Sequence, residues 1–517
     1  MSGSSSSKPR KRFVGRSTRP AGSNLGAVLS QIPDSILEDP LLQAAANQLP
    51  RNYSFEIHKT VYHVRKNSAK MVALQMPEGL QMYACTIADI IERRVDPSPL
   101  RSKVDSCCRF TGALTVIMGD VTYGACCIDD YTAVALGCDM LVHYGHSCLV
   151  PIDTTTIKTL YVFVEIAIDS EHLADTVRAN FPDLSRTFRE RLLSDDGAHV
   201  STGEAIHRGR PSLAIEAPAS EPDRNGDGEG DDGPTRLALV STIQFVAAAQ
   251  KLKDNLSIEL SSDRLQGSSP LQGGNALITG GSVSERDPSP PEPRLWKGRY
   301  QIVIPRAKPL SPGEILGCTA PKLSDNVDAL VYIGDGRFHL EAIMIANPGV
   351  AAFRYDPYSK KLTRERYDHA EMRATRALAV RKASESLGEG EDAKWGVILG
   401  TLGRQGSFRQ HQAIQHQLKT SRHRVPYIPI LLSELSPAKL GCFAPHISVF
   451  VQTSCPRLSI DWGYAFTQPL LSPYEAAVVM GTQRGWAGTP GGEGEYPMDF
   501  YEKESVWARA RMWQGRQ

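Results

Sequence analysis

One stretch of this sequence occurs twice, and it sets the frame for much of the chain. The segment LSPGEILGCTAP, Leu310 to Pro321, returns almost intact as LSPAKLGCFAP, Leu435 to Pro445. Before each copy stand an apolar run, a helical stretch and a second apolar run, and after each copy a third apolar run ends in a polar turn. These runs are LALVST, YQIVIPRAKP and ALVYIGDGRF around the first copy, and WGVILGTL, VPYIPILLSE and ISVFVQTSCP around the second. The repeat predicts that two parts of the chain share one arrangement of strands and helices.

The N-terminal part of the chain fits the same frame. There VALQMP, a helical stretch, LTVIMGD, a cysteine-rich loop and DMLVHYGHSC follow one another in the same order. Short continuous apolar runs separated by helical segments are typical of parallel strands that are buried on both faces of a sheet. We therefore expect an α/β fold of three related domains, each a short and mainly parallel sheet flanked by helices.

The length of the chain agrees with several domains, because 517 residues are too many for one hydrophobic core. Two stretches, near 216–234 and from Ser261 to Pro293, are too polar and too rich in Gly, Pro and Ser to bury a core. The expected organisation is a disordered basic tail over 1–52, a first α/β domain over 53–185, a low-complexity insertion over 186–235, a second α/β domain over 236–350 with a disordered insertion over 261–296, a third α/β domain over 351–480, and a C-terminal tail over 481–517.

Composition argues against two classes of partner. Lys and Arg number 58 against 57 Asp and Glu, a net charge of +1, so no global field attracts nucleic acid or an anionic membrane. The basic stretch KPRKRFVGRSTRP near the N-terminus is best explained as part of a solvated tail. The sequence has no apolar run long enough to span a bilayer and no signal-like segment near Met1. Because the cysteines lie among apolar strands rather than at the spacing of a small secreted scaffold, we expect a cytoplasmic location.

The cysteines carry the chemistry. Four of the ten lie in one segment, GDVTYGACCIDDYTAVALGCDMLVHYGHSC, Gly119 to Cys148, and others follow at Cys318 and Cys455 in similar surroundings. Soft thiolate ligands suit an iron–sulfur cluster or a zinc ion. No C-x-x-C pair occurs, so the fold must assemble any metal site. In parallel α/β sheets, ligands bind beyond the carboxyl ends of the strands, where the cysteine-bearing loops are expected. Three such loops, one from each domain in a pseudo-threefold arrangement, would form a central metal site.

Spacing alone leaves the ligand set open. Cys442 occupies the repeat position of Cys318, while Cys455 matches Cys148 and Arg337 in the turn after the next strand. A lone cysteine in an apolar α/β protein is most often a small buried hydrophobe. We apply that interpretation to Cys85, Cys107, Cys108, Cys138 and Cys442. The candidates for ligands are the cysteines in turns beside glycine or proline: Cys126, Cys318 and Cys455.

Four segments together carry a family resemblance. DVTYGACCIDDYTA, HYGHSCLVPID, LSPGEILGCTAP and FVQTSCPRLSIDWG resemble the diphthamide synthase family, from about Tyr53 to about Tyr474. In that family three α/β domains each give one cysteine to a [4Fe–4S] cluster. The resemblance implies that Cys126 of YGAC, Cys318 of LGCT and Cys455 of TSCPR are the ligands. Cys127 adjoins Cys126, and motif alone does not choose between them.

The resemblance also implies a reaction and its partners. Family members transfer the 3-amino-3-carboxypropyl group of S-adenosylmethionine to one histidine of translation elongation factor 2, with methylthioadenosine as by-product. This transfer by radical chemistry is the first step of diphthamide biosynthesis. Eukaryotic members pair with a second, related synthase subunit as a heterodimer and take electrons from a small iron protein. No G-x-G-x-x-G loop follows the first strand, where MVALQMPEGLQ stands instead, so the usual methyltransferase grip on the cofactor is not evident.

Several polar residues near the cysteines are candidates to hold S-adenosylmethionine, and Arg404 could pair with its carboxylate. The set is Asp120, Thr122, Tyr123, Gln244, Asp335, His339, Arg404, Gln405 and Arg457. Arg337 belongs to the same turn as Asp335, and a surface ion pair is the plain alternative for each arginine. Asp129 and Asp130 stand where a helix would begin, and we expect them to cap it.

Two rival interpretations remain at this point. His143 and His146 form H-x-x-H beside Cys148, which invites a zinc site, although zinc sites usually add a second close ligand pair that is absent here. The chain could therefore be a zinc-stabilised scaffold subunit without chemistry of its own. It could also be an α/β transferase that binds its nucleotide without any metal.

Overall fold

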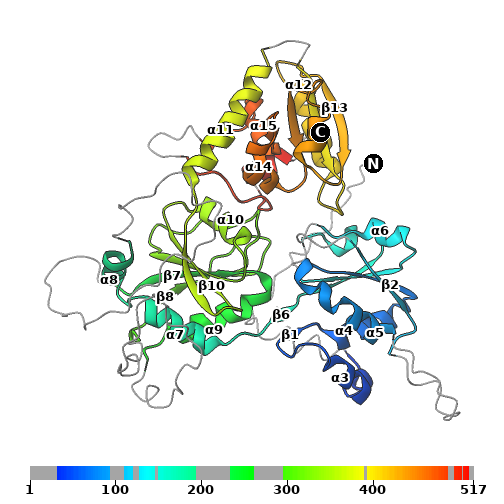
Figure 1. Ribbon diagram of the computed structural model, residues 1–517, viewed down its shortest axis with the longest axis vertical. Coiled ribbons are helices and arrows are strands. Elements are labelled where there is room, and N and C mark those ends of the chain that lie inside the picture. The colour runs from blue at the N-terminus through cyan, green and yellow to red at the C-terminus, as the bar shows by residue number, and fades with distance from the viewer. Residues whose placement is uncertain are drawn as a thin grey trace, which may run out of the picture.

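Three α/β lobes form the molecule. The computed structural model describes residues 32–92, 110–119, 127–145, 149–193, 233–260, 295–388, 393–486, 494–503 and 505–511. The lobes, here domains 1, 2 and 3 in chain order, lie at the corners of a triangle, with domain 1 at the lower right, domain 2 at the lower left and domain 3 on top (Figure 1). Each is built on its own sheet, and a two-stranded ribbon is the only further sheet in the described part of the chain.

Domain 1 has a four-stranded sheet in the order β3-β2-β4-β5, and every neighbouring pair is parallel. Its strands are β2 (Met71–Gln75), β3 (Leu114–Ile117), β4 (Met140–Tyr144) and β5 (Lys158–Val162). Its helices are α4 (Ile57–Lys66), the 3₁₀ helix η1 (Glu78–Tyr83), α5 (Ala84–Glu92) and α6 (Asp130–Ala135), with a 3₁₀ turn η2 (Ile152–Thr154) before β5. The central strands β2 and β4 are almost wholly buried, as strands covered on both faces must be.

Domain 2 repeats this arrangement and adds one strand. Its order is β11-β10-β9-β7-β8, in which only the edge strand β11 is antiparallel. The strands are β7 (Arg236–Ser241), β8 (Gln301–Val303), β9 (Ala329–Ile333), β10 (Ala351–Asp356) and β11 (Lys361–Glu365). The helices are α7 (Ser170–Asn180), α8 (Ser185–Phe188), a π-helical turn η3 (Arg189–Leu193), the 3₁₀ turn η5 (Ile243–Phe245), α9 (Val246–Leu256) and α10 (Phe338–Ala346).

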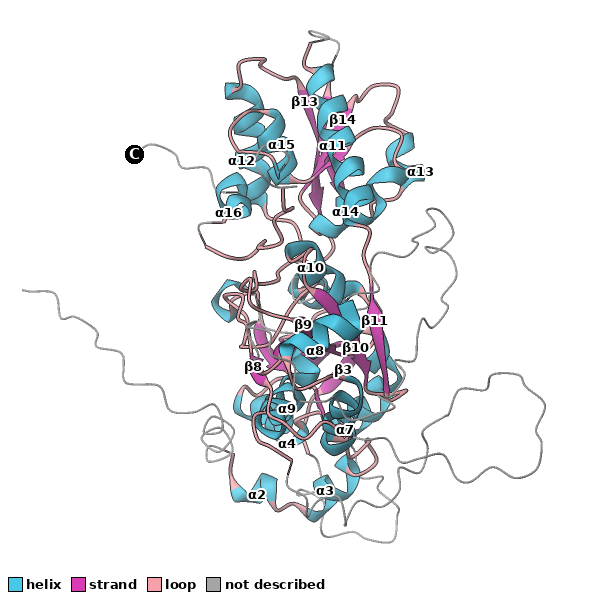
Figure 2. Ribbon diagram, turned by 90° about the vertical axis from the view of Figure 1, so that its left-hand side faces the viewer, coloured by secondary structure: helices cyan, strands magenta, loops and turns pink. Residues whose placement is uncertain are grey.

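Domain 3 has the order β13-β12-β14-β15, again all parallel. Its strands are β12 (Trp395–Gly400), β13 (Tyr427–Leu432), β14 (Val449–Gln452) and β15 (Leu470–Leu471). Its helices are α11 (His369–Ser386), α12 (Phe408–Thr420), α13 (Pro437–Gly441), α14 (Pro456–Trp462), the 3₁₀ turn η8 (Gly463–Ala465), α15 (Pro473–Val479) and α16 (Val506–Arg511). Helices α12, α15 and α16 lie on one side of this lobe and α13 on the other (Figure 2).

The expected internal repeat is therefore a repeat of topology. In each domain the first strand of the unit lies between the second and the third, and the fourth strand follows beyond the third. The prediction of three related, mainly parallel α/β domains is confirmed. Among the described residues, no helix is both long enough and apolar enough to cross a membrane.

Two domain boundaries differ from those expected. Helix α7 packs its Leu173 and Val177 into the core of domain 2, together with Leu252 of α9, so domain 1 ends near β6 (Glu165–Ile166) and not at 185. Strands β10 and β11 also belong to the sheet of domain 2, so residues 351–365 are not part of domain 3. The sequence shows that a segment is helical or extended, but not which of two neighbouring sheets it joins.

Both expected tails are shorter than predicted. Residues 32–49 form α2 (Asp34–Leu37) and α3 (Pro40–Ala46), whose Ile36 and Leu42 are buried in the core of domain 1. The short strand β1 (Tyr53–Ser54) then pairs with β6. At the other end, residues 494–503 and 505–511 return to the protein, and Tyr496 and Trp507 are buried in a core shared with domain 2. We call these two described segments the C-terminal strap.

Arg178 bonds the backbone at both ends of the segment between α9 and β8. Its guanidinium is 1% exposed and donates to the carbonyl oxygens of Asn255 and Ile258 on one side, and of Trp296 and Gly298 on the other, at 2.7–3.1 Å. The predicted insertion over 261–296 falls mostly outside the described residues, as do 194–232 of the insertion predicted over 186–235. The two ends of the first of these segments are nevertheless tied together by one side chain.

Candidate metal centre

The cysteine-bearing loops lie at the carboxyl ends of strands, as expected for a parallel sheet. Cys127 follows β3, Cys318 lies between β8 and β9, and Cys455 comes three residues after β14. Cys126 itself, with Asp120, Thr122 and Tyr123, lies outside the described residues. Cys318 and Cys455 are both partly exposed, whereas Cys127 is buried.

Arg457 joins the loops of Cys318 and Cys455. Its Nη1 donates to the carbonyl oxygen of Gly317 at 3.2 Å and to that of Phe338 at 2.7 Å, so the residue before Cys318 is bonded to a residue two positions after Cys455. The guanidinium carbon also stands 4.5 Å from the centre of the Phe338 ring. Gly317 permits this arrangement, because a Cβ there would collide with the Phe338 ring.

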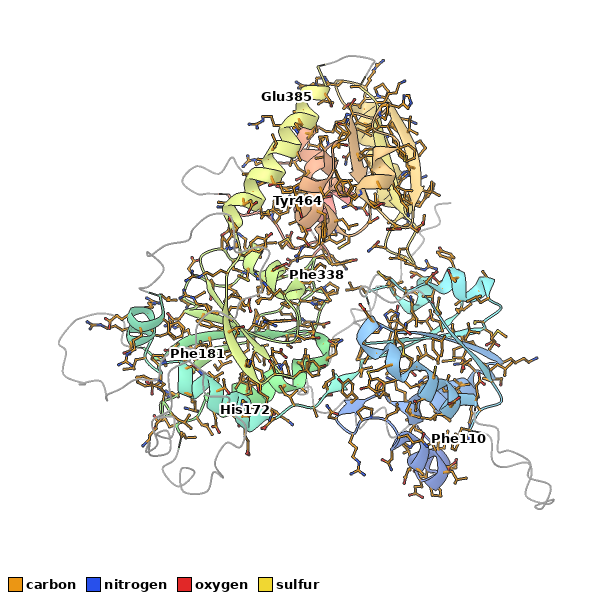
Figure 3. All side chains as sticks on the ribbon, in the orientation of Figure 1. Phe110, His172, Phe181, Phe338, Glu385 and Tyr464 are labelled. Carbon is orange, nitrogen blue, oxygen red and sulfur yellow. The ribbon has the colours of Figure 1, made fainter. Side chains whose placement is uncertain are left out.

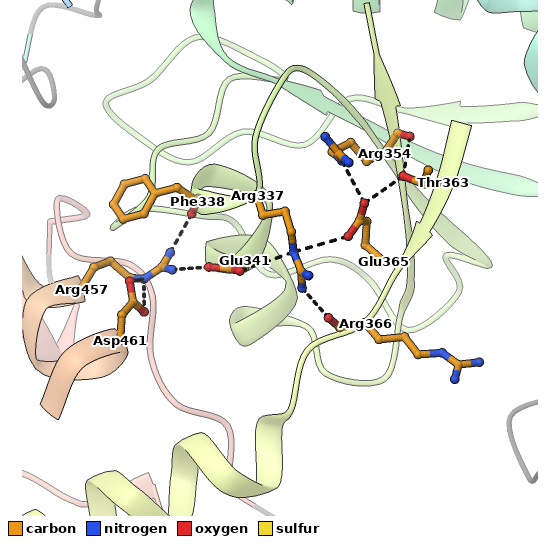
Figure 4. A network of polar contacts seen from close by, with 9 residues as sticks. All are labelled: Arg337, Phe338, Glu341, Arg354, Thr363, Glu365, Arg366, Arg457 and Asp461. Atoms are coloured by element: carbon orange, nitrogen blue, oxygen red, sulfur yellow. Dashed lines mark hydrogen bonds and ion pairs between the residues drawn. The ribbon is translucent and has the colours of Figure 1, made fainter. Parts of the chain in front are cut away.

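The charge of Arg457 is balanced inside the protein. The side chain is 2% exposed and forms ion pairs with Glu341 at 2.6 Å and with Asp461 at 2.8 Å. Burial alone would lower the pKa of Arg457, but the two carboxylates outweigh it and raise that pKa. Figure 4 shows these contacts as one network, which continues through Arg337 to Glu365. Arg457 was expected to hold the substrate, and in the structure it joins domains 2 and 3.

A second arginine joins domains 1 and 3. Arg404 pairs with Asp130 through two hydrogen bonds, Nε to Oδ1 at 2.7 Å and Nη2 to Oδ2 at 2.6 Å. Burial would raise the pKa of Asp130, but hydrogen bonds from Arg404 and Thr156 outweigh it and hold that pKa below its usual range. The guanidinium fork proposed for a substrate carboxylate is thus occupied by Asp130. Asp130 was expected to cap α6; that role falls to Asp129 alone, which accepts from the backbone of Thr132.

The turn of Arg404 fits closely against the loop of Cys127. The backbone nitrogen of Arg404 donates to the carbonyl of Ile128 at 3.0 Å, and the Gln405 amide nitrogen lies 3.8 Å from the Cys127 sulfur. Gly403 has φ +52, and a Cβ there would stand 2.7 Å from the carbonyl oxygens of Cys127 and Ile128. A side chain at position 403 would therefore push the two loops apart.

The third junction joins domains 1 and 2. Gln244, which follows β7, donates its amide nitrogen to the carbonyl of Gly145 at the end of β4, at 2.7 Å. All three domain pairs thus meet through polar residues that follow strand ends, and these include Gln244, Arg404, Gln405 and Arg457 of the expected set. Asp335 is exposed, and His339 is partly buried with its ring against Phe338. Phe338 lies at the inner edge of domain 2, facing the other two domains (Figure 3).

The remaining cysteine and histidine expectations have mixed outcomes. Cys138 is buried as predicted, but Cys85 and Cys442 are exposed, so the prediction of a buried hydrophobe is wrong for both. Cys107 and Cys108 lie outside the described residues. Of the H-x-x-H pair, His143 is fully buried with Nδ1 3.2 Å from Oε1 of Gln75, and His146 lies outside the described residues.

Three features beside the cysteines were missed by the sequence analysis. Two are buried glutamines, Gln75 and Gln452, which end otherwise apolar strands; that pattern could have drawn attention to them. The third is the C-terminal strap. Its Phe500 donates its backbone N–H to the carbonyl of Cys318 at 3.3 Å, and Ala320 donates to Met498 at 2.8 Å. Nothing in the sequence of the strap indicates which loop it covers.

Comparison with known proteins decides the family. The model of the family described as "Putative diphthamide synthesis protein" matches residues 76–218 and 292–490. This chain belongs to that family. It is 42% identical to the 2-(3-amino-3-carboxypropyl)histidine synthase subunit 1 of Gallus gallus, over 98% of this chain and 92% of the relative. The proteins of the same name from Homo sapiens and Schizosaccharomyces pombe are 43% and 41% identical, over 93% and 96% of this chain and 82% and 93% of theirs.

A solved structure agrees with the fold of this chain. The crystal structure of Dph2 from Pyrococcus horikoshii with a 4Fe-4S cluster matches it with a TM-score of 0.51 at 18% identity, over 86% of this chain and 92% of that one. The match supports the three-domain α/β architecture.

The donors present suit an iron–sulfur cluster. Cys318 and Cys455 carry soft sulfur donors on adjacent loops, and both are partly exposed. Cys455 is the residue directly before α14. Within the described residues no three His, Cys, Asp or Glu side chains are grouped to hold a metal ion, and the third expected ligand, Cys126, lies outside them.

Proposed function

We propose that this protein transfers the 3-amino-3-carboxypropyl group of S-adenosylmethionine to a histidine of translation elongation factor 2, with a [4Fe–4S] cluster held by Cys126, Cys318 and Cys455. The observation that carries the proposal is the contact between Arg457 and Gly317, which brings the loops of two expected ligands together across a domain boundary. The family membership supports the reaction, because its close relatives are named for it.

Cys126, Cys318 and Cys455 would hold the cluster, which when bound and reduced would supply the electron needed to cleave the bond between the sulfonium and the aminocarboxypropyl carbon. The residues of the chain supply position and protection. Arg457, Arg404 and Gln244 fix the three domains against one another at the strand ends, so the cysteine loops are held before any substrate arrives. Both arginines bond to protein carboxylates, so they act on the reaction through the arrangement of domains.

The remaining candidate residues, which do not join the domains through an ion pair, would contact S-adenosylmethionine. Gln405 lies beside the Cys127 sulfur, His339 lies beside Phe338, and Asp335 is exposed in the turn after β9. Asp120, Thr122 and Tyr123 precede Cys126 in the chain and complete the proposed set. A related second subunit would complete a heterodimer, since the relatives are named "subunit 1". A small iron protein would deliver electrons, and the protein substrate would place the reaction in the cytoplasm.

The experiment that tests this reaction measures its products. The protein, purified with its second subunit without oxygen, is incubated with S-adenosylmethionine, dithionite and unmodified elongation factor 2. We expect methylthioadenosine to form only with reductant, and the factor to gain one aminocarboxypropyl group on a histidine. Release of S-adenosylhomocysteine with a methylated product, or equal turnover without reductant, would contradict the proposal. A colourless protein with stoichiometric zinc would favour a scaffold instead.

A further inference from the structure

A buried glutamine holds the backbone beside Cys127. Gln75 ends β2 and is 1% exposed. Its Nε2 donates to the carbonyl oxygen of Cys127 at 2.8 Å, and its Oε1 accepts from the backbone N–H of Asp129 at 3.1 Å. His143 lies with Nδ1 3.2 Å from the same Oε1, so a proton on Nδ1 would fix the orientation of the amide.

A second buried glutamine does the same beside Cys455. Gln452 ends β14 and is fully buried. Its Nε2 donates to the carbonyl oxygen of Cys455 at 2.9 Å, and its Oε1 accepts from the backbone N–H of Ser454 at 2.7 Å. Here Ser459 of α14 fixes the orientation, with its Oγ 3.1 Å from Nε2.

The two glutamines are not ordinary core residues. Each ends a strand of apolar residues, where a buried amide is costly unless both of its ends are hydrogen-bonded. In both cases one amide bonds a carbonyl and an N–H of the same short loop, so the loop is held at two points. The loop of Cys318 needs no such side chain, because the C-terminal strap bonds its backbone directly.

We propose that Gln75 and Gln452 are positioning residues of the cluster site. Gln75 holds the backbone of Cys127 and Asp129, and Gln452 holds the backbone of Ser454 and Cys455, in the geometry that the site requires. The proposal rests on the proposed ligand set. It adds that a glutamine at the end of the first strand of domain 1 and one at the end of the third strand of domain 3 have the same role. Each holds the backbone of a cysteine-bearing loop.

The first test uses the protein without its cluster, so that it does not depend on activity. Hydrogen exchange is measured at the backbone amides of Asp129 and Ser454 in the full-length wild type and in Gln75→Met and Gln452→Met. Methionine keeps the volume but removes both hydrogen bonds. We expect the amide held by the replaced glutamine to exchange about tenfold faster, as loss of one hydrogen bond would give, while the amide held by the other glutamine stays unchanged.

Gln410 provides the matched control. It is 5% exposed on α12, and within the described part of the chain its amide nitrogen has no hydrogen-bond partner. Gln410→Met should leave exchange at both loops as in the wild type. Gln75→Glu and Gln452→Glu form a second pair of variants with nearly unchanged volume. They keep the acceptor for the backbone N–H but place an oxygen against the cysteine carbonyl, so we expect them to loosen the same loops.

The second test examines the cluster after anaerobic reconstitution. Iron and sulfide content and the electron paramagnetic resonance spectrum of the reduced cluster are compared in all five variants. We expect the Gln75 and Gln452 variants to show less iron or shifted g-values, and Gln410→Met to match the wild type. Unchanged exchange together with an unchanged spectrum would overturn the proposal, as would equal loss of folded protein in the Gln410, Gln75 and Gln452 variants. A wild type that binds no cluster would refute the proposed function but leave the exchange test decisive for the loops.

Discussion

The two copies of the repeated segment have nearly the same sequence but opposite surroundings. In the first copy, Glu314 and Ile315 are 2% and 0% exposed, and Leu316 pairs with Thr319 through backbone hydrogen bonds around Cys318. In the second copy, the chain forms the short helix α13, Lys439 forms an exposed ion pair with Glu434, and Cys442 is exposed. The first copy lies inside the molecule and the second at its surface.

The C-terminal strap accounts for much of this difference. Asp499 pairs with Thr319 and Phe500 bonds Cys318, so the strap covers the first copy. The strap is anchored by Trp507, which is 1% exposed, and by Tyr496, whose hydroxyl donates to the buried Glu475 at 3.0 Å. The environment of a repeated cysteine is therefore set by what the rest of the chain places over it. In domain 3 the proposed ligand is Cys455, which lies in the next loop.

Removing the anchor of the strap should have the largest effect on stability. Trp507→Ala deletes a buried indole and its hydrogen bond to Pro497, which should lower the free energy of unfolding by about 3–5 kcal/mol. Urea denaturation measures this loss. Hydrogen exchange should rise at residues 315–320 and stay constant at 438–443. Trp462 is 57% exposed, and Trp462→Ala should change stability by no more than about 0.5 kcal/mol. Equal exchange in both copies would show that the strap does not protect the first.

Removing Arg457, which links the first copy to the loop of Cys455, should have the second-largest effect on stability. Arg457→Met leaves Glu341 and Asp461 without their buried cation, and loss of one partner of a buried pair costs about 3–5 kcal/mol, with partial exposure of the acids placing this case at the lower end. Denaturation and iron content both report the change. The control in the second copy is Lys439→Met, an exposed pair for which we expect less than about 1 kcal/mol. An Arg457→Met protein as stable as that control would contradict the proposed link.

The burial of the first copy should also make stability depend on pH. Burial raises the pKa of Glu314 to about 7 from an ordinary 4.5. The folded state then holds this proton more tightly than the unfolded state, so the wild type loses stability as pH rises from 4.5 through 7. The difference of about 2.5 pKa units corresponds to at most about 3 kcal/mol. Glu314→Gln should therefore gain stability relative to the wild type between pH 4 and 8. A constant stability difference between Glu314→Gln and the wild type across this range would refute a buried carboxyl at 314.

Deleting the segment between α9 and β8 should have the smallest effect. Replacing residues 261–294 by a short Gly-Ser linker should change stability by about 1 kcal/mol or less, because Arg178 already closes its base and loop length contributes weakly. Denaturation and iron content should both match the wild type. Loss of folded protein would show that the segment covers part of the core, as the strap does.

The domain architecture could be predicted because its signals are local. Continuous apolar runs such as VALQM and WGVILG predict buried strands, and the internal repeat predicts the order in which strands and helices follow one another. The assignment of α7 to domain 2 could not be predicted, since an amphipathic helix has the same pattern on either sheet. The burial of the first repeat copy depends on the strap, which lies far away in sequence and bonds the backbone of Cys318.

The contact between the loops of two candidate cysteines follows from their positions at strand ends, but the partners of the arginines do not follow from the sequence. Cys318 and Cys455 stand in recognisable motifs, and the structure places their loops side by side. Arg404 and Arg457 have the same sequence context whether the carboxylate they bind comes from a substrate or from another domain. Only the fold shows that Asp130 and Glu341 take that place.

The most direct test of the account is the iron content of four cysteine variants. Cys126→Ala, Cys318→Ala, Cys455→Ala and Cys442→Ala are each purified without oxygen together with the second subunit, and iron and sulfide are measured per folded protein. The account predicts that the first three lose most of their cluster and that Cys442→Ala retains it, although Cys442 is the repeat partner of Cys318. Loss of iron in Cys442→Ala with retention in Cys455→Ala would mean that the ligands follow the repeat, and would contradict the account.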